Sequence, residues 1–352
     1  MARTYSNLWP QVVRWENLLL AYRKCRRRKR YKSVATRFDF AWEEELVRLQ
    51  RELVAGTYTP GDYHHFVITD PKRRKISAAP FRDRVVHHAL VNVLEPIFER
   101  RFIYDSYECR RGKGTHRAIV RAQRFLRRYD WYLKTDIVRF FPNVDHAVLF
   151  DLLARTIRDS HTVDLIAKIL KSGEGVLAKE ASQYWFPGDD LFAVTRPRGL
   201  PIGNLTSQFF ANVFLDPVDH FVKEELQVPG YVRYADDLLL FGDSKDQLWQ
   251  WKEAIIDVLA KQRLRLHADK THLHPSRCGV PFLGFRLFRE GRRLKQETIR
   301  RFNRRIRKLQ WEKKNGIVDF SRVSTSLKAW RAHAGQANST GIRRDLWKRL
   351  IF

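Results

Sequence analysis

The chain has 352 residues and a formal net charge of +28, and 44% of its residues are hydrophobic. That length can bury the core of one large or two modest domains, and no segment approaches the length of a membrane-spanning helix. Because the basic residues are spread along the chain beside 23 Phe, 12 Tyr and 10 Trp, nucleic acid is the expected partner and an anionic membrane the weaker alternative.

Cysteine usage and the N-terminus indicate the compartment. The three cysteines are far apart and lack a metal-binding spacing: Cys25, Cys109 and Cys278. They predict reduced thiols in a cytoplasmic protein. Arg14 and Glu16 interrupt the apolar core that a signal peptide needs, so we expect none.

Residues 1–60 predict a basic, helical N-terminal extension. Apolar residues at helical spacing predict one helix over residues 9–30, which ends in a run of cations. That cationic end is either a solvated face or a contact for a nucleic-acid backbone. A second helix is expected around residues 42–54 and stops at Gly56.

Residues 63–77 predict a β-hairpin with a cationic tip. Two strand-like runs, 63–68 and 72–77, flank the turn signals Asp70 and Pro71. Such a tip is either plain surface or a site for a nucleotide triphosphate, which attracts several mobile positive charges.

Asp83 is then expected to open a long apolar helix that runs towards Pro96. His87 and His88 lie on this helix, and we expect them to be packed, since no ligand-spaced partner for a metal is near. The loop 110–115 that follows is basic and contains two glycines, but it does not match the phosphate-binding P-loop pattern.

Residues 131–137 predict a strand in which Lys134 and Asp136 alternate with apolar neighbours. A carboxylate at the end of a buried strand is costly unless it has a partner, so a functional role for Asp136 is favoured. Asp145 is expected to cap the next helix, and the bulky Phe141 is a candidate wall of a nucleotide site.

Two helices are expected over residues 145–172, followed by an irregular insertion over 173–198. The segment Gly199-Leu-Pro-Ile-Gly203 leads into another helix, and its glycines predict a close backbone approach.

Two adjacent carboxylates, Asp236 and Asp237, lie between strongly β-prone runs. Residues 231–234 and 238–241 predict the two strands of a hairpin whose tight turn carries both aspartates. Adjacent carboxylates repel each other unless cations lie between them, and oxygen-rich sites suit Mg²⁺. A two-metal site needs a third carboxylate, which Asp136 can supply.

The remaining chain predicts a helix over residues 246–262, a strand over 264–270 that ends in Lys270, and a hairpin over 278–288. From residue 295 onward the pattern is helical and highly basic, with its apolar residues on one face. That surface suits contact along a nucleic-acid duplex.

The order of these motifs resembles bacterial reverse transcriptases related to group II intron enzymes, over roughly residues 60–340. The motifs are Lys72-Arg-Arg-Lys-Ile-Ser-Ala-Ala-Pro-Phe-Arg-Asp-Arg84, Asp136-Ile-Val-Arg-Phe-Phe141, Tyr234-Ala-Asp-Asp237, Asp269-Lys-Thr271 and Phe282-Leu-Gly-Phe285. The resemblance implies an α+β, right-hand polymerase fold, in which an antiparallel palm sheet carries the three aspartates. It divides the chain into fingers over 61–130, palm over 131–290 with part of the fingers near 199–215, and a helical thumb over 291–352.

The same resemblance implies a role for each matching residue. Asp136, Asp236 and Asp237, with the carbonyl of Ile137, would hold two Mg²⁺ ions, which Mn²⁺ can replace, and Lys270 would protonate departing pyrophosphate. The implied nucleotide-binding residues are Lys72, Arg74, Arg82, Phe141, Ile202, Gly203 and Gln208. The implied primer grip is Phe282, Leu283 and Gly284. The implied partners are template RNA, a cDNA or DNA primer, and dNTPs.

Two segments narrow the resemblance. Ile202-Gly-Asn-Leu-Thr-Ser-Gln208 stands where most reverse transcriptases have Gln-Gly-x-x-x-Ser-Pro. This segment resembles the reverse transcriptases of diversity-generating retroelements, as does Trp330-Arg-Ala-His-Ala-Gly-Gln-Ala337. Enzymes of that family copy a template RNA with errors at adenines and work with a small basic accessory protein that forms a pentameric ring.

Alternatives stay open at this point. One is a reverse transcriptase of the retron, group II intron-like or phage-defence type. The segment 202–208 disfavours the retron type, and the few residues expected after the thumb disfavour the intron type. An alternative of another class is a non-catalytic RNA-binding subunit, which the presence of all three carboxylates disfavours.

Overall fold

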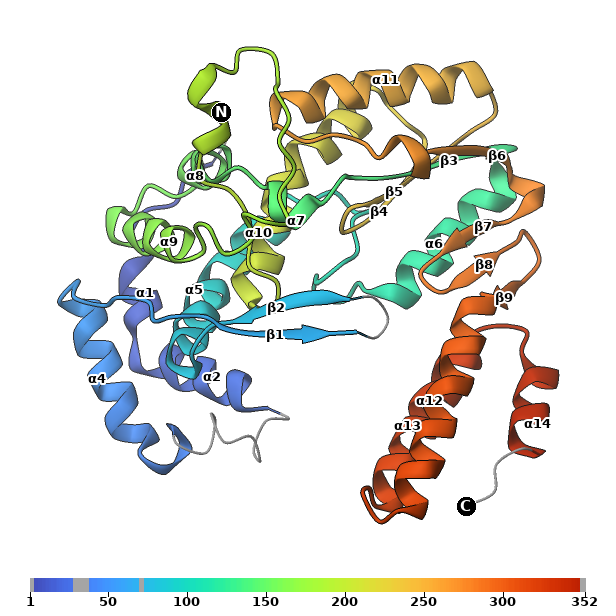
Figure 1. Cartoon of the computed structure of the whole chain (residues 1–352). Coiled ribbons are helices and arrows are strands. Elements are labelled where there is room, and N and C mark those ends of the chain that lie inside the picture. The colour runs from blue at the N-terminus through green and yellow to red at the C-terminus, as the bar shows by residue number, and fades with distance from the viewer. Residues whose placement is uncertain (1–2, 28–37, 70–72, 349–352) are drawn as a thin grey trace.

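The computed structural model describes residues 3–27, 38–69 and 73–348, and it combines helices with antiparallel sheets (Figure 1). Three sequence predictions lie outside these residues: the hairpin turn at Asp70 and Pro71, the phosphate contact of Lys72, and the cations at 28–30. Within the described ranges, no helix is both long enough and apolar enough to cross a membrane.

The N-terminal region forms two helices where one was predicted. Helix α1 (Trp9–Val13) and helix α2 (Trp15–Arg26) are separated at Arg14, whose ψ of 137° is extended. The side chain of Asn17 donates to the carbonyls of Val12 and Ala89, at 2.9 and 3.0 Å, and so satisfies the backbone at the break. Helix α4 (Trp42–Val54) lies where it was predicted.

The predicted hairpin is present, and the long helix after it begins earlier than predicted. Strands β1 (His64–Ile68) and β2 (Arg74–Ala78) pair in antiparallel register. Helix α5 (Phe81–Glu99) starts two residues before Asp83 and continues past Pro96, so the predicted helix start is wrong. Asp83 instead accepts hydrogen bonds from the Tyr58 hydroxyl and the Gly61 N–H, at 2.9 and 2.8 Å.

A four-stranded antiparallel sheet with the order β4-β5-β3-β6 lies at the centre of the fold. Its strands are β3 (Trp131–Asp136), β4 (Gly230–Tyr234), β5 (Asp237–Gly242) and β6 (His272–Pro275). Alternate residues of β5 belong to two separate cores: Leu238 and Leu240 to one, Leu239 and Phe241 to the other. Both sheet faces are therefore buried, which leaves the strand ends as the place for polar chemistry.

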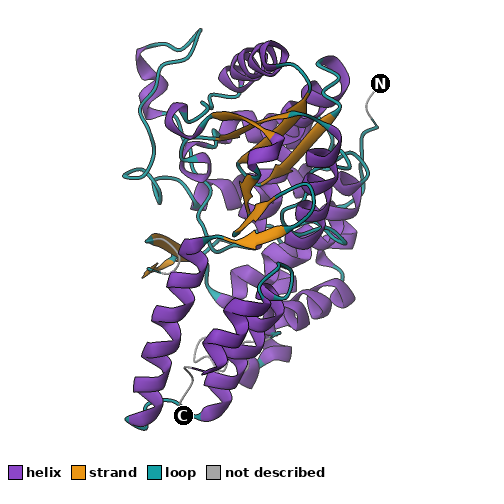
Figure 2. Cartoon of the chain, turned by 90° about the vertical axis from the view of Figure 1, so that its right-hand side faces the viewer, coloured by secondary structure: helices purple, strands orange, loops and turns teal. Residues whose placement is uncertain are grey.

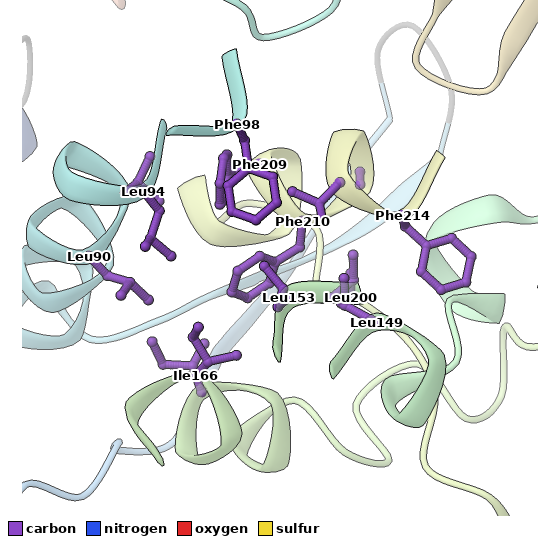
Figure 3. Packing of buried hydrophobic residues seen from close by; sticks show 14 of the residues in the cluster. Leu90, Leu94, Phe98, Leu149, Leu153, Ile166, Leu200, Phe209, Phe210 and Phe214 are labelled. Carbon is purple, nitrogen blue, oxygen red and sulfur yellow. The ribbon is translucent and has the colours of Figure 1, made fainter. Parts of the chain in front are cut away.

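Helices cover the two faces. The first core includes residues of α5, α10 and α11, and the second includes residues of α6 and of the C-terminal part of the chain (Figure 1). The bounds of the remaining helices up to this point are α6 Thr115–Arg128, α7 Phe140–Asn143, α8 His146–Ala154, α9 Ser160–Ser172, α10 Leu205–His220 and α11 Lys245–Lys261. Figure 3 shows the first core where α5, α8, α9 and α10 meet, with Phe98 against Phe209 at a ring-centroid distance of 5.5 Å.

The insertion at 173–198 is irregular, as predicted, apart from a 3₁₀ turn at Leu191–Thr195. The predicted strand at 264–270 is wrong. Leu266 forms only an isolated bridge with Ile137, and Ala268–Lys270 is a 3₁₀ turn that precedes β6.

A small three-stranded sheet connects the central sheet to the C-terminal helices (Figure 2). It contains β7 (Val280–Phe282), β8 (Phe285–Leu287) and β9 (Arg292–Leu294), and the helices are α12 (Gln296–Lys314), α13 (Phe320–Ala334) and α14 (Thr340–Lys348). Phe302 of α12 stacks on Trp330 of α13, with ring centroids 4.4 Å apart. The predicted hairpin and the basic C-terminal helix are thus confirmed.

Candidate active site

The central sheet brings Asp136 to the adjacent pair Asp236 and Asp237, which follow it in the sequence by a hundred residues. Asp136 ends β3 and lies opposite Asp237, which begins β5. Asp236 lies in the turn between β4 and β5, and its carbonyl accepts the N–H of Ile137 at 3.2 Å. Ala235 has a φ of 53°, so the turn passes through the left-handed region. Antiparallel pairing therefore carries the carboxylates to one end of the sheet.

The electrostatics of this cluster are unfavourable without added positive charge. Burial, followed by the neighbouring carboxylates of Asp136, Asp237 and Glu108, raises the pKa of Asp236 to about 7. Among the described residues, Asp236 forms no ion pair. A buried carboxylate in such surroundings either keeps its proton near neutral pH or requires a bound cation.

The other two aspartates each contact a lysine. The Lys270 ammonium contacts the Asp136 carboxylate, although Lys270 lies on a 3₁₀ turn and not on a strand. The Lys134 ammonium lies 3.2 Å from Asp237 Oδ1. In the part of the chain that the structure describes, no three His, Cys, Asp or Glu side chains are grouped closely enough to hold a metal ion.

Glu108 is a residue that sequence reasoning missed. It lies on a segment that runs beside β4 through a bridge between Ser106 and Arg233. Burial raises the pKa of Glu108, the positive charges of Arg233 and Arg74 lower it, and Asp237 raises it. Arg74 of β2 therefore lies within electrostatic reach of Glu108, which is itself near Asp237. No local pattern marks Glu108, because only the tertiary fold brings it to the turn.

The loop before α10 attaches the β1–β2 hairpin to the aspartate-bearing half of the molecule. The carbonyl of Ile202 accepts the Ser77 N–H at 2.9 Å. Asn204 accepts from the Ala79 N–H at 3.0 Å and donates to the Ser77 carbonyl at 2.9 Å. Asn204 was not predicted, although its position just before a helix was a usable signal.

Gly203 is required by the same close approach. Its φ is +121°, and a Cβ atom added there would lie 2.8 Å from Ile76 Cγ2. On the other side of the loop, the Leu200 N–H donates to the Phe141 carbonyl at 2.8 Å. Phe141, Ile202 and Gly203 are therefore parts of one connected structure, and Gln208 is exposed on α10.

Arg82 lies against other partners. Its guanidinium contacts Glu52 of α4 and lies over the Tyr58 ring, 5.2 Å from the centroid. Its role in phosphate binding stays a prediction, as do the roles of the other site residues.

The turn between β7 and β8 carries the predicted primer-grip residues. Leu283 and Gly284 have φ of 45° and 89°, while Phe282 is buried. The Gly284 carbonyl accepts the Lys295 N–H at 3.1 Å and the Thr298 hydroxyl at 3.3 Å. The turn is therefore bonded to the beginning of α12.

A fully buried ion pair between Arg233 and Asp219 supports the turn that carries Asp236. Arg233 donates through Nε and Nη2 to both carboxylate oxygens of Asp219, at 2.7 to 2.9 Å. Arg233 Nη1 donates to the Ala235 carbonyl at 3.2 Å, and Tyr231 donates its hydroxyl to Asp219 at 2.8 Å. This pair fixes the backbone immediately before Asp236.

A basic groove of about 710 Å³ lies between α12 and the hairpin end at Thr69. Its cationic lining residues are Arg300, Arg301, Arg304, Arg305, Lys308 and Arg322. Such a density of arginine suits contact with a phosphate backbone.

Comparison with known proteins identifies a matching family. The family described as reverse transcriptase (RNA-dependent DNA polymerase) matches residues 69–287, which is more than half of the chain. The match includes strand β2, the β4–β5 and β7–β8 hairpins, the loop 199–204 and all three aspartates.

Individual relatives agree with that match. The chain is 27% identical over 319 residues to protein YkfC of Escherichia coli (strain K12), which covers 76% of this chain and 80% of YkfC. It is 29% identical over 183 residues to the group II intron-encoded protein LtrA of Lactococcus lactis subsp. cremoris, covering 51% of this chain and 28% of LtrA. It is 29% identical over 186 residues to nuclear intron maturase 2, mitochondrial, of Arabidopsis thaliana, covering 48% of this chain and 25% of that protein.

Proposed function

The chain belongs to the reverse transcriptase family, and from that premise we propose that it synthesises DNA on an RNA template at Asp136, Asp236 and Asp237. The observation that carries the proposal is the register of β3 against β5, which places Asp136 opposite Asp237 beside the Asp236 turn. The family's domain has the right-hand polymerase fold, and the mixture of helices and antiparallel sheets agrees with that α+β class. We assign fingers to 61–130, palm to 131–290 and thumb to 291–352.

By the chemistry of their donors, the three aspartates suit two Mg²⁺ ions, although their side chains are not grouped closely enough in this structure to enclose one. They offer carboxylate oxygens, the ligands that Mg²⁺ prefers, and burial together with the neighbouring negative charges raises the pKa of Asp236. Asp136, Asp236 and Asp237 would hold the ions, with the Ile137 carbonyl as a further donor. When bound, the metals would activate the primer 3′-hydroxyl and neutralise charge on the triphosphate.

The protein's own residues would position the reactants. Arg74 would bind the triphosphate, and Lys270, beside Asp136, would donate a proton to the departing pyrophosphate. Phe141 and the loop around Ile202 would enclose the nucleotide, while the basic groove on α12 would bind the primer–template duplex. Dissociation of Lys270 from Asp136 would free the lysine for its catalytic role.

The finer proposal is a cytoplasmic diversity-generating retroelement enzyme that makes errors opposite template adenines. It rests on the segment 202–208, where Ile202 replaces a glutamine and so removes a side-chain hydrogen bond beside the incoming nucleotide. The expected partner is a small basic accessory protein. Restoring Ile202→Gln should lower misincorporation opposite adenine, and an unchanged error rate would remove this residue from the explanation.

A group II intron-like role is the second candidate, and the names of LtrA and the Arabidopsis maturase favour it. Binding of a structured intron RNA in preference to an unstructured RNA of equal length would support that role. Equal affinity for both RNAs would favour the retroelement proposal.

Primer extension on an RNA template tests the central proposal. Asp236→Asn should abolish Mg²⁺-dependent extension. Asp243→Asn is a matched control, because this carboxylate directly follows the opposite end of β5 and accepts the Asp130 N–H at 3.0 Å. A fully active Asp236→Asn enzyme would refute the assignment, and RNA binding by a wild type that never extends a primer would favour the non-catalytic subunit.

A further inference from the structure

Lys134 connects the aspartate cluster to the β7–β8 hairpin. It lies on β3 two residues before Asp136, opposite Leu239 of β5 and His272 of β6. Its ammonium lies 3.2 Å from Asp237 Oδ1 and donates to the Pro281 carbonyl at 3.1 Å. The side chain is 17% exposed, so both contacts are largely shielded from water.

The two contacts of Lys134 belong to different parts of the molecule (Figure 1). Asp237 is in the central sheet, whereas Pro281 is in β7, opposite Arg286 of β8. The turn of that hairpin is bonded to α12 through the Gly284 carbonyl. One side chain therefore joins a proposed metal ligand to the strand that leads into the proposed primer grip.

Lys134 and Lys270 differ in how firmly they are held. Lys270 is 51% exposed and lies on a 3₁₀ turn, so it can leave Asp136 at small cost. Lys134 is fixed by the sheet register and by the Pro281 carbonyl. A cation that binds at Asp237 must therefore share this carboxylate with an ammonium group that stays in place.

We propose that Lys134 is a positioning residue that weakens divalent-cation binding at Asp237 and keeps this carboxylate aligned with the β7–β8 hairpin. The physical basis is Coulombic, because a fixed positive charge beside a ligand opposes a second cation at the same carboxylate. Full metal occupancy would then require the negative charge of the triphosphate. This inference rests on the proposed polymerase function.

The test measures Mn²⁺ binding to the whole protein without nucleotide, by electron paramagnetic resonance. Lys134→Met removes the charge and keeps an apolar stem, and it should tighten Mn²⁺ binding by a factor of about ten. Lys134→Arg keeps the positive charge and should therefore keep the wild-type affinity for Mn²⁺. Lys252→Met is the matched control, since Lys252 is also ion-paired and is 20% exposed, but lies on α11 beside Glu253.

The alignment role predicts a separate kinetic effect. Lys134→Met should lower kcat for primer extension by about tenfold with little change in the KM for dNTP, because the carboxylate and the hairpin are no longer joined. Lys134→Gln keeps an N–H donor without the charge, so it should tighten Mn²⁺ binding while losing less of kcat. This second variant also serves if Lys134→Met fails to fold in a circular-dichroism melt.

The outcomes separate the inference from the function on which it rests. Unchanged Mn²⁺ affinity in Lys134→Met or Lys134→Gln, with an active wild type, overturns the role of Lys134 and leaves the polymerase assignment intact. If the Asp236→Asn variant binds Mn²⁺ as tightly as the wild type does, and the wild type never extends a primer, the proposed function itself is overturned.

Discussion

Asp236→Asn should make the metal-free protein more stable even though it should abolish polymerisation. Burial, then Asp136 and Asp237, raise the pKa of Asp236 from 3.8 to about 7. Folded protein therefore holds this proton more tightly than unfolded protein, and stability is lost as pH rises from the unfolded pKa through the folded pKa. A shift of about three units corresponds to at most about 4 kcal/mol, at 1.36 kcal/mol per unit. Asparagine carries no such penalty.

Urea unfolding in EDTA measures this effect. Between about pH 5 and about pH 8, the stability advantage of Asp236→Asn over wild type should grow by about 1–3 kcal/mol, allowing for partial screening by nearby lysines. Asp243→Asn should show no such growth. Adding Mn²⁺ should stabilise the wild type at high pH and leave the variant unchanged. A variant whose advantage is the same at both pH values, or which is less stable at high pH, would refute the reasoning.

Three further predictions concern the scaffold. Asp219→Asn leaves a buried arginine without its charge partner and should lower the free energy of unfolding by about 3–5 kcal/mol in urea titrations, whereas a loss below about 1 kcal/mol would contradict the buried pair. Gly203→Ala should cost about 1–3 kcal/mol, because its Cβ meets Ile76 and its φ of +121° disfavours alanine; stability equal to wild type would show that β2 moves freely. Asp216 first, and also Glu224, raise the pKa of His220 to about 9. The contacts of His220 with these carboxylates therefore stabilise the fold fully below about pH 6.5, and this contribution is lost as pH rises through 9. His220→Gln should flatten that part of the stability–pH curve, and a curve identical to that of the wild type would argue against these contacts.

The strands of the site could be predicted because their local signals agree with the tertiary structure. Residues of β3 and β5 have high β propensity, and Asp236 occupies the turn that the flanking runs define, whereas Asp237, which was predicted in the same turn, is the first residue of β5 and pairs with Tyr234. The pairing of Asp136 with Asp237 needed the family resemblance, since no local pattern specifies register across a hundred residues. The register of β3 against β5 shows that pairing directly.

Errors arose where tertiary contacts replaced local ones. Apolar alternation at Leu264 and Leu266 suggested a strand, but Leu266 makes only one bridge, to Ile137, so regular pairing begins only at β6. Asp83 has the chemistry of a helix cap, yet it is buried and bonds to Tyr58 and the Gly61 N–H. The contribution of Glu108 likewise depends on a distant element that no local window contains.

The bond between Ser77 and residue 202 uses the main chain alone. Every amino acid carries the same carbonyl, so natural variation or engineering can exchange the Ile202 side chain while β2 keeps its anchor. The neighbouring Gly203 and Asn204 lack this freedom. A side chain at 203 would meet Ile76, and the Asn204 side chain itself forms the hydrogen bonds to Ser77 and Ala79. A library randomised at position 202 should therefore yield mostly folded enzymes that differ in copying accuracy, whereas one randomised at 203 or 204 should yield mostly damaged proteins.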